Sequence, residues 1–190
     1  MAGHHENKPA LLKNILHTRG LMDVIRIGES LGKNGFRLTI AAPLLRHSER
    51  RAELAAMLRR EAPSLPVQMM GEADVYELFR RHSLYLFPYR QNHNVFIPTS
   101  VLEAMASGIP VVISDLPMFR PLIGSENNFS LSYPAGSIEG LLHAILEAQS
   151  NFEMTRERAG RAARHIRREW TVQRSAEQLL SVASKLLADR

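Results

Sequence analysis

The sequence predicts an α/β fold, a doubly wound parallel sheet of about six strands with helices on both faces. Segments with strand and helix periodicity alternate along the chain, as the crossover connections of a parallel sheet require. The segments LYLF and VVIS are largely apolar on both sides, which is typical of strands covered on both faces. No repeat or flexible linker interrupts the 190 residues, so we expect one domain over residues 9–190 after a disordered tail at 1–8.

The individual elements follow from local periodicity. A short apolar run at 9–14 precedes a helix at about 20–31, in which apolar residues recur every three or four positions before the GKNG turn. The segment FRLTIAA at 36–42 alternates apolar and polar side chains, which indicates a strand. The remaining expected elements are helix 48–62, strand 66–71, helix 74–82, strand 84–89, helix 99–107, strand 110–114, strand 128–133 and helices from Gly136 onward.

Composition excludes several classes of protein. Cysteine is absent, which rules out a disulfide framework and a thiolate metal site. No apolar run approaches the roughly 18 to 20 residues of a membrane-spanning helix, and the polar start MAGHHENKPA does not resemble a signal peptide. The 45% of hydrophobic residues can form one sizeable core. We therefore expect a soluble cytoplasmic protein, either free or peripheral at the inner face of the membrane.

An arginine-rich stretch near the C-terminus contributes much of the net charge of +5. On a helix, Arg158, Arg161, His165 and Arg168 would share one face. The simpler interpretation is a solvated face, and the alternative is contact with an anionic partner such as phospholipid headgroups. No aromatic side chains are interleaved with the basic ones to stack on bases, so nucleic acid is not expected as a partner.

The segments that follow the strands hold the candidate binding residues, because ligands of such sheets lie at the carboxyl ends of the strands. Lys13 and Arg19 lie six residues apart in the segment KNILHTRG. After the long polar segment YRQNHNVFI, a helix starts at Pro98 with Thr99 and Ser100 in its first turn. A helix N-terminus binds anions, and nearby cations suit phosphate oxygens. On spacing alone, the simpler interpretation is that Lys13 and Arg19 are ordinary surface cations.

Other kinds of site lack their motifs. The first strand is not followed by the G-x-G-x-x-G turn of nicotinamide-binding folds, and no G-x-x-x-x-G-K-[ST] phosphate loop occurs. The histidines form no H-E-x-x-H pair, and no D-x-D motif is present to hold a metal on a diphosphate. We expect no metal and no cofactor, and no residue is assigned a catalytic role.

The stretch PTSVLEAMASGIPVVISDLPMFRPLI at 98–123 resembles the signature of retaining glycosyltransferases of the GT-B fold, the large family 4 or group 1 glycosyltransferases. Three further segments resemble parts of the same family: LLKNILHTRGLMDVI, VQMMGEADVYELFRRHSLYLFPY and REWTVQRSAEQLL. The resemblance covers nearly the whole chain but only one half of a GT-B enzyme, the C-terminal Rossmann-like domain. It implies that this domain binds a nucleoside diphosphate sugar, while a missing N-terminal domain or a partner chain binds the acceptor.

The resemblance also implies roles for individual residues. Two glutamates eight positions apart contact the donor in the family, and the second matches Glu103, which would accept hydrogen bonds from the ribose hydroxyls. The first falls at Val95, so Asn92, His93 and Asn94 are the candidates for the loop that contacts the sugar. A purely structural role for Glu103, such as an ion pair with Arg120, is the alternative.

The remaining implied contacts concern the diphosphate and the base. Lys13 and Arg19 match the cations that bind the diphosphate in the family, with their identities exchanged, and Thr99 and Ser100 would lie near the same group. Met70 and Gly71 would lie near the nucleobase. A non-catalytic glycosyltransferase-like binding module, which the valine at 95 favours, and half of a sugar-nucleotide epimerase remain as alternatives.

Overall fold

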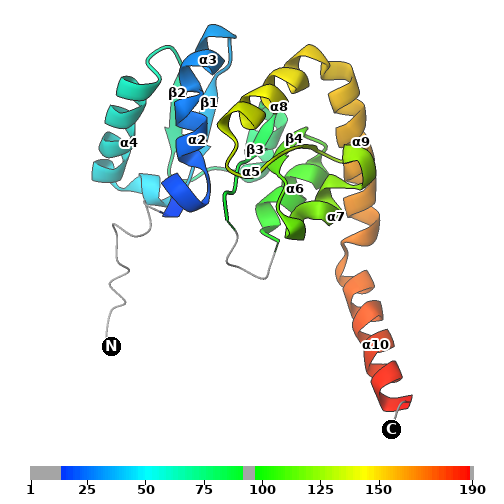
Figure 1. Cartoon of the computed structure of the whole chain (residues 1–190). Helices are drawn as coiled ribbons and strands as arrows, with labels where there is room; N and C mark the ends of the chain where they lie inside the picture. The colour runs from blue at the N-terminus through cyan, green and yellow to red at the C-terminus, as the bar shows by residue number, and fades with distance from the viewer. Residues whose placement is uncertain (1–13, 92–96, 189–190) are drawn as a thin grey trace, which may run out of the picture.

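The computed structural model describes residues 14–91 and 97–188 (Figure 1). This part is an α/β structure with parallel strands and helices on both sides of them, which confirms the predicted fold class. The strands are β1 (Leu38–Ala41), β2 (Val67–Met70), β3 (Tyr85–Phe87), β4 (Val111–Ser114) and β5 (Leu131–Tyr133). The α-helices are α2 (Leu21–Arg26), α3 (Gly28–Lys33), α4 (Ser48–Glu61), α5 (Val75–Arg81), α6 (Thr99–Ser107), α7 (Arg120–Ile123), α8 (Ile138–Ser150), α9 (Phe152–Glu169) and α10 (Val172–Ala188). Shorter helical turns are η1 (Asn14–Thr18), η2 (Pro43–Arg46), η3 (Pro117–Phe119) and η4 (Ser125–Asn127).

The strands form two parallel sheets. β1 pairs with β2, and β4 lies between β3 and β5. The sequence predicts a single sheet of about six strands, whereas the described residues contribute five strands. β1 and β3 do not pair, and residues of both strands, Thr39 and Leu86 among them, line a cavity of about 320 Å³. The apolar run expected at 9–14 lies, apart from Asn14, outside the described residues.

Two layers of helices enclose the strands. On one face, α2, α3 and α8 pack against β4 and β5 through buried residues such as Val24, Val112 and Leu141. Partly buried Leu38 of β1 and Val67 of β2 join this cluster, so the same helices connect both sheets. On the other face, α6 and α9 pack against β3 and β4. Burial of these apolar side chains stabilises the arrangement and fixes which strand ends lie together.

Two predicted elements differ from the structure. The helix expected at 20–31 is divided into α2 and α3 at Ile27, and Gly28 packs so closely that a Cβ there would lie 2.4 Å from the Cβ of Ala62. The strand expected at 128–133 begins only at Leu131, because the ring of Phe129 stacks on His165 of α9, with 4.4 Å between ring centroids. Tertiary contacts therefore override local periodicity at both places.

The arginine-rich stretch forms α9, but its basic face is only partly solvated. His165 stacks on Phe129, and the Nε of Arg161 donates to the carbonyl oxygen of Asn128 at 3.4 Å. Arg158 is half-buried, while Arg168 is exposed. Arg161 and Arg168 agree with the expected solvated face, since both are exposed. Arg158 and His165 differ from it, because they are partly buried where α9 covers the segment that leads into β5.

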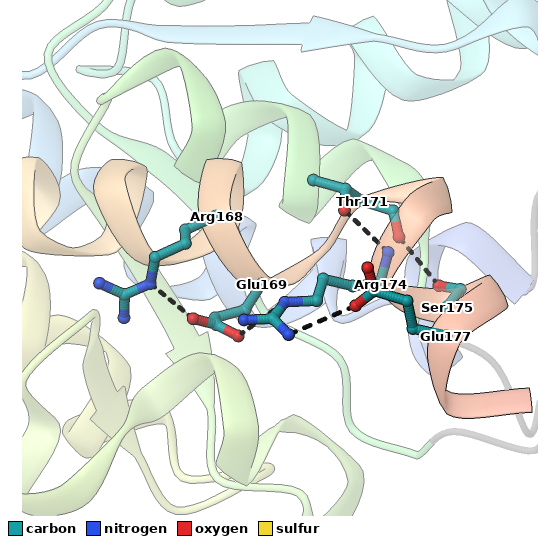
Figure 2. A network of polar contacts seen from close by, with 6 residues as sticks. All are labelled: Arg168, Glu169, Thr171, Arg174, Ser175 and Glu177. Carbon is teal, nitrogen blue, oxygen red and sulfur yellow. Dashed lines mark hydrogen bonds and ion pairs between the residues drawn. The ribbon is translucent and has the colours of Figure 1, made fainter. Parts of the chain in front are cut away.

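α10 continues from α9 and extends away from the remainder of the chain (Figure 1). Figure 2 shows the polar contacts at the junction: Glu169 lies between Arg168 and Arg174, and Arg174 also contacts Glu177. The hydroxyl of Thr171 accepts a hydrogen bond from the backbone N–H of Arg174 at 3.1 Å, which caps the start of α10. Several large apolar side chains of α10 are exposed: Val172, Leu179, Leu180, Val182, Leu186 and Leu187.

Within residues 14–91 and 97–188, no helix combines the length and the hydropathy that a membrane span requires.

Candidate functional site

The helix that follows β3 in the chain is α6, and it has the bounds that the sequence predicts. Pro98 is the N-cap residue in an extended conformation, and its side chain makes no capping hydrogen bond to the first turn. The first backbone N–H groups of a helix have no intrahelical partner, so an uncapped start favours an anionic ligand. Thr99 is exposed and Ser100 is half-buried in this first turn. The helix ends at Gly108, whose φ of 85° suits glycine.

Tyr85 of β3 connects this helix start to two other predicted residues. Its hydroxyl shares a hydrogen bond with the side chain of Ser100. Burial raises the pKa of Tyr85 above its usual value, and the hydrogen bond to Ser100 opposes this rise. Tyr89 and Glu103 raise the pKa further, whereas the positive charge of Arg19 lowers it. All of these side chains therefore lie close enough to Tyr85 to affect its ionisation.

Glu103 lies on the second turn of α6 and is half-buried. Among the described residues it forms no ion pair, so the alternative of a pair with Arg120 is not observed. A carboxylate that is partly shielded from water and unpaired can accept hydrogen bonds from a ligand without first losing a protein partner. This arrangement is consistent with the donor-binding role that the resemblance implies.

Arg19 precedes α2 and contacts the ring of Tyr89. It is exposed, and its guanidinium carbon lies 5.9 Å from the centroid of the Tyr89 ring, within the range of a cation–π contact. It forms no ion pair with the residues that the structure describes. The next residue, Gly20, has a φ of 73°, and a Cβ there would lie 1.7 Å from the carbonyl oxygen of Pro88. The close approach of Gly20 to Pro88 therefore requires a glycine at this position, next to Arg19.

The geometry thus places Ser100 and Glu103 on successive turns of α6, and it places Arg19 over Tyr89 and in the lining of the same cavity as Tyr85. Thr99 is adjacent in the first turn of α6. Lys13 and the loop candidates Asn92, His93 and Asn94 lie outside the described residues, as does Val95.

Met70 and Gly71 lie at the carboxyl end of β2, in the other sheet. A Cβ at Gly71 would lie 2.7 Å from the backbone nitrogen of Arg46, so close packing against η2 explains this glycine. Arg46 also forms an ion pair with Glu72 at 2.8 Å, which holds the same strand end against η2. Packing alone therefore accounts for Gly71, and its expected place beside a nucleobase stays a prediction.

Sequence reasoning missed the two tyrosines of the site. Tyr85, Phe87 and Tyr89 point to the same side of the strand, and the rings of Phe87 and Tyr89 stack with 4.3 Å between their centroids. The alternation of aromatic residues in LYLFPY is the signal that predicts a shared face, directed toward α6 and α9. It does not by itself predict that the Tyr85 hydroxyl reaches Ser100.

Metal binding gains no support from the geometry. In the described part of the chain, no group of three or more histidine, aspartate or glutamate side chains is arranged to hold a metal ion.

Comparisons with known proteins agree with the sequence resemblance. The profile of a family described as "Glycosyl transferases group 1" matches residues 17–151. The crystal structure of TarM superposes with a TM-score of 0.70 at 17% sequence identity, over 86% of this chain and 32% of that one. Sucrose-phosphate synthase from Thermosynechococcus elongatus superposes with a TM-score of 0.68 at 16% identity, over 91% of this chain and 43% of that one.

The two structural similarities confirm the Rossmann-like GT-B fold that the sequence predicts. The chain spans less than half the length of either protein. No curated protein is significantly similar to it in sequence.

Proposed function

The chain belongs to the group 1 glycosyl transferases, and from this premise we propose that it is the donor-binding domain of a retaining glycosyltransferase. The complete enzyme transfers a sugar from a nucleoside diphosphate sugar to a glycan, a lipid or a small-molecule acceptor. One observation carries the proposal: Arg19, Ser100 and Glu103, selected from the sequence, lie around Tyr85 where α6 begins. A cation and the start of a helix can bind the diphosphate of such a donor, and a carboxylate can bind the hydroxyls of its ribose.

Each residue has a separate role in this proposal. Glu103 accepts hydrogen bonds from the ribose hydroxyls, and Arg19 pairs with the diphosphate. Thr99 and Ser100 present the first amides and hydroxyls of α6 to the same phosphates. As the sugar leaves, negative charge develops on the diphosphate, and donors fixed at this place stabilise it without a metal ion.

The remaining roles in the proposal rest on the sequence alone. Lys13 supplies a second cation for the diphosphate, Asn92, His93 and Asn94 contact the sugar, and Met70 and Gly71 lie near the base.

An alternative in a different class is a non-catalytic module that binds nucleotide without transfer. The valine at position 95, where the family has a glutamate, favours this alternative.

The acceptor requires a second surface. Transfer needs donor and acceptor held together in a cleft that excludes water, and such proximity lowers a barrier by on the order of 7 to 11 kcal/mol. We propose that an N-terminal domain or a partner chain supplies this surface, and that the 190 residues alone bind nucleotide without transferring sugar. The exposed apolar side chains of α10 offer contact area for that second part. Contact with the inner face of a cytoplasmic membrane stays a proposal for the complete protein.

A panel of nucleosides, nucleoside monophosphates and nucleoside diphosphates tests the proposal by calorimetry on the purified chain. We expect one nucleoside diphosphate to bind, more tightly than its nucleoside and equally well in the presence of EDTA. Absence of binding across the panel contradicts donor binding. Incubation with nucleoside diphosphate sugars and acceptors tests the second part, because robust transfer without an added partner would show that this chain is not half of an enzyme.

A further inference from the structure

A buried ion pair joins α2 to the segment that follows β3. Asp23 of α2 is 1% exposed, and the Nε of Arg90 donates to its Oδ2 at 2.6 Å. A second hydrogen bond runs from the Nη2 of Arg90 to Oδ1, so the guanidinium and the carboxylate form a bidentate ion pair. The side chain of Arg90 is 35% exposed. These two residues are 67 positions apart in the chain, and the pair fixes where the two segments meet.

Two further contacts connect the same segments. The backbone N–H of Arg90 donates to the carbonyl oxygen of Thr18 at 3.0 Å. Gly20 lies against the carbonyl oxygen of Pro88 with no room for a Cβ. Residues 18–20 and 88–90 are therefore held together at three places: by the Thr18 bond, by the Gly20 contact, and by the ion pair just beyond them.

Arg19 and Tyr89 are the middle residues of these two segments. The guanidinium of Arg19 lies over the Tyr89 ring, and Arg19 has no ion-pair partner among the described residues. A long side chain that is exposed and unpaired samples many rotamers unless its backbone and its contact surface are fixed. The contacts around it fix both.

We propose that Asp23 and Arg90 are positioning residues, which hold Arg19 over Tyr89 so that its guanidinium faces the diphosphate of the donor. The inference rests on the proposed function for the identity of the ligand. Arg90 itself is not a phosphate-binding residue here, because the Nε and Nη2 of its guanidinium both donate to Asp23. General stabilisation is a weaker explanation, since buried ion pairs add little net stability compared with neutral side chains of the same size.

Nucleotide binding separates positioning from stabilisation. In Asp23→Asn we expect affinity for the bound nucleoside diphosphate to fall about tenfold and affinity for the nucleoside to change by less than about twofold, because only the phosphate contact is disturbed. Arg81→Gln is the matched control, since Arg81 pairs with Glu77 through a 2.7 Å contact on α5, and it should change neither affinity. Equal losses for nucleoside and diphosphate would overturn the inference.

Combining Asp23→Asn with Arg19→Gln tests more directly whether Asp23 acts through Arg19. If Asp23 acts through Arg19, then Asp23→Asn has no further effect on diphosphate affinity once Arg19 is glutamine. A residue with a purely structural role would reduce affinity by the same factor in both backgrounds. Additive effects in this double-mutant cycle therefore overturn the inference, and non-additive effects support it.

A readout without ligand separates this inference from the proposed function. The Nε–H resonance of Arg19, assigned by its loss in Arg19→Lys, reports the mobility of the side chain in solution. We expect this resonance to move and to show faster motion in Asp23→Asn, but not in Arg81→Gln. If no nucleotide binds the wild-type chain, the proposed function fails. The resonance still tests the positioning role on its own, because an unchanged Arg19 signal in Asp23→Asn overturns that role.

A second variant covers a failure to fold. Asp23→Asn leaves the charge of Arg90 partly in contact with water, whereas Arg90→Gln alone would leave a buried carboxylate without its partner. The double variant Asp23→Asn/Arg90→Gln replaces the pair by neutral amides and serves if the single variant unfolds. It should show the same selective loss of diphosphate affinity, and wild-type affinity in this variant overturns the inference.

Discussion

The hydroxyl of Tyr85 in β3 shares a hydrogen bond with the side chain of Ser100 in the first turn of α6. This bond ties the first turn of the helix to the first residue of β3, the strand that precedes it in the chain. Glu103 lies one turn further along α6. The bond therefore connects β3 directly to the helix that holds the candidate ribose-binding carboxylate.

Removing either hydroxyl should expose this coupling. Tyr85→Phe and Ser100→Ala are each expected to lower the free energy of unfolding by about 1 kcal/mol, because a partly buried hydrogen bond is lost. Once one hydroxyl is gone, the second substitution should cost less, so the double variant is non-additive. Urea denaturation measures all four proteins. The control is Tyr76→Phe, at an exposed position of α5. Its effect on the free energy of unfolding should add to that of Ser100→Ala in the corresponding double variant.

Glu103→Ala should weaken nucleoside diphosphate binding while the fold persists. The loss of hydrogen bonds to a charged acceptor corresponds to about 1.5 to 3 kcal/mol, or roughly ten- to a hundredfold in dissociation constant. Calorimetry gives the constant, and a thermal melt checks the fold. The control is Glu157→Ala on the exposed side of α9. An unchanged dissociation constant would refute the assignment of Glu103 to the ribose.

Arg19→Gln should affect the phosphates selectively. Because the guanidinium is proposed to meet the diphosphate and not the nucleoside, its neutralisation is expected to weaken nucleoside diphosphate binding about tenfold and nucleoside binding hardly at all. EDTA should change neither result. Arg26→Gln, an exposed cation at the end of α2, is the matched control for the loss of one charge. A strict requirement for magnesium would contradict the proposal that side-chain cations act in place of a metal.

Most of the local structure could be predicted from the sequence, because its signals are local. α6 has the predicted bounds since Pro98 is suited to the start of a helix and Gly108 adopts the left-handed conformation that ends it. The grouping of Arg19 with Ser100 and Glu103 was also within reach, because parallel topology collects the segments after the strands at one edge.

The unpredicted features depend on contacts between distant segments. The Asp23–Arg90 pair joins residues 67 positions apart, and no spacing rule connects them. The role of Tyr85 depends on how β3 is aligned with α6, and Gly28, next to the break at Ile27, packs closely against Ala62, 34 positions further along the chain. Periodicity predicts which face of an element is buried, but not which neighbour it meets.

The junction between α9 and α10 gives a prediction about local stability. Thr171 caps α10, so Thr171→Ala should reduce protection of its first turn against hydrogen exchange by about 1 kcal/mol. The exposed ion pairs of Arg174 with Glu169 and Glu177 add little, since solvent screens them. Ser181→Ala, in the middle of the same helix, should leave that turn unchanged. Equal protection in Thr171→Ala and wild type would show that Thr171 does not hold the helix start.

Alkaline pH should destabilise the fold through Tyr133. Burial raises the pKa of Tyr133 well above its ordinary value of 10.0, and the charge of Asp23 adds to this effect. Above about pH 10 the unfolded chain therefore releases a proton that the folded chain retains, so the free energy of unfolding falls as the pH rises. The Tyr133 hydroxyl has no hydrogen-bond partner among the described residues, and Tyr133→Phe should cost little stability at pH 8 while reducing the decline above pH 10. Chemical denaturation across this range measures both effects, with Tyr76→Phe as the exposed control. Parallel stability curves for wild type and Tyr133→Phe would mean that Tyr133 ionises as readily in the folded chain as in the unfolded one.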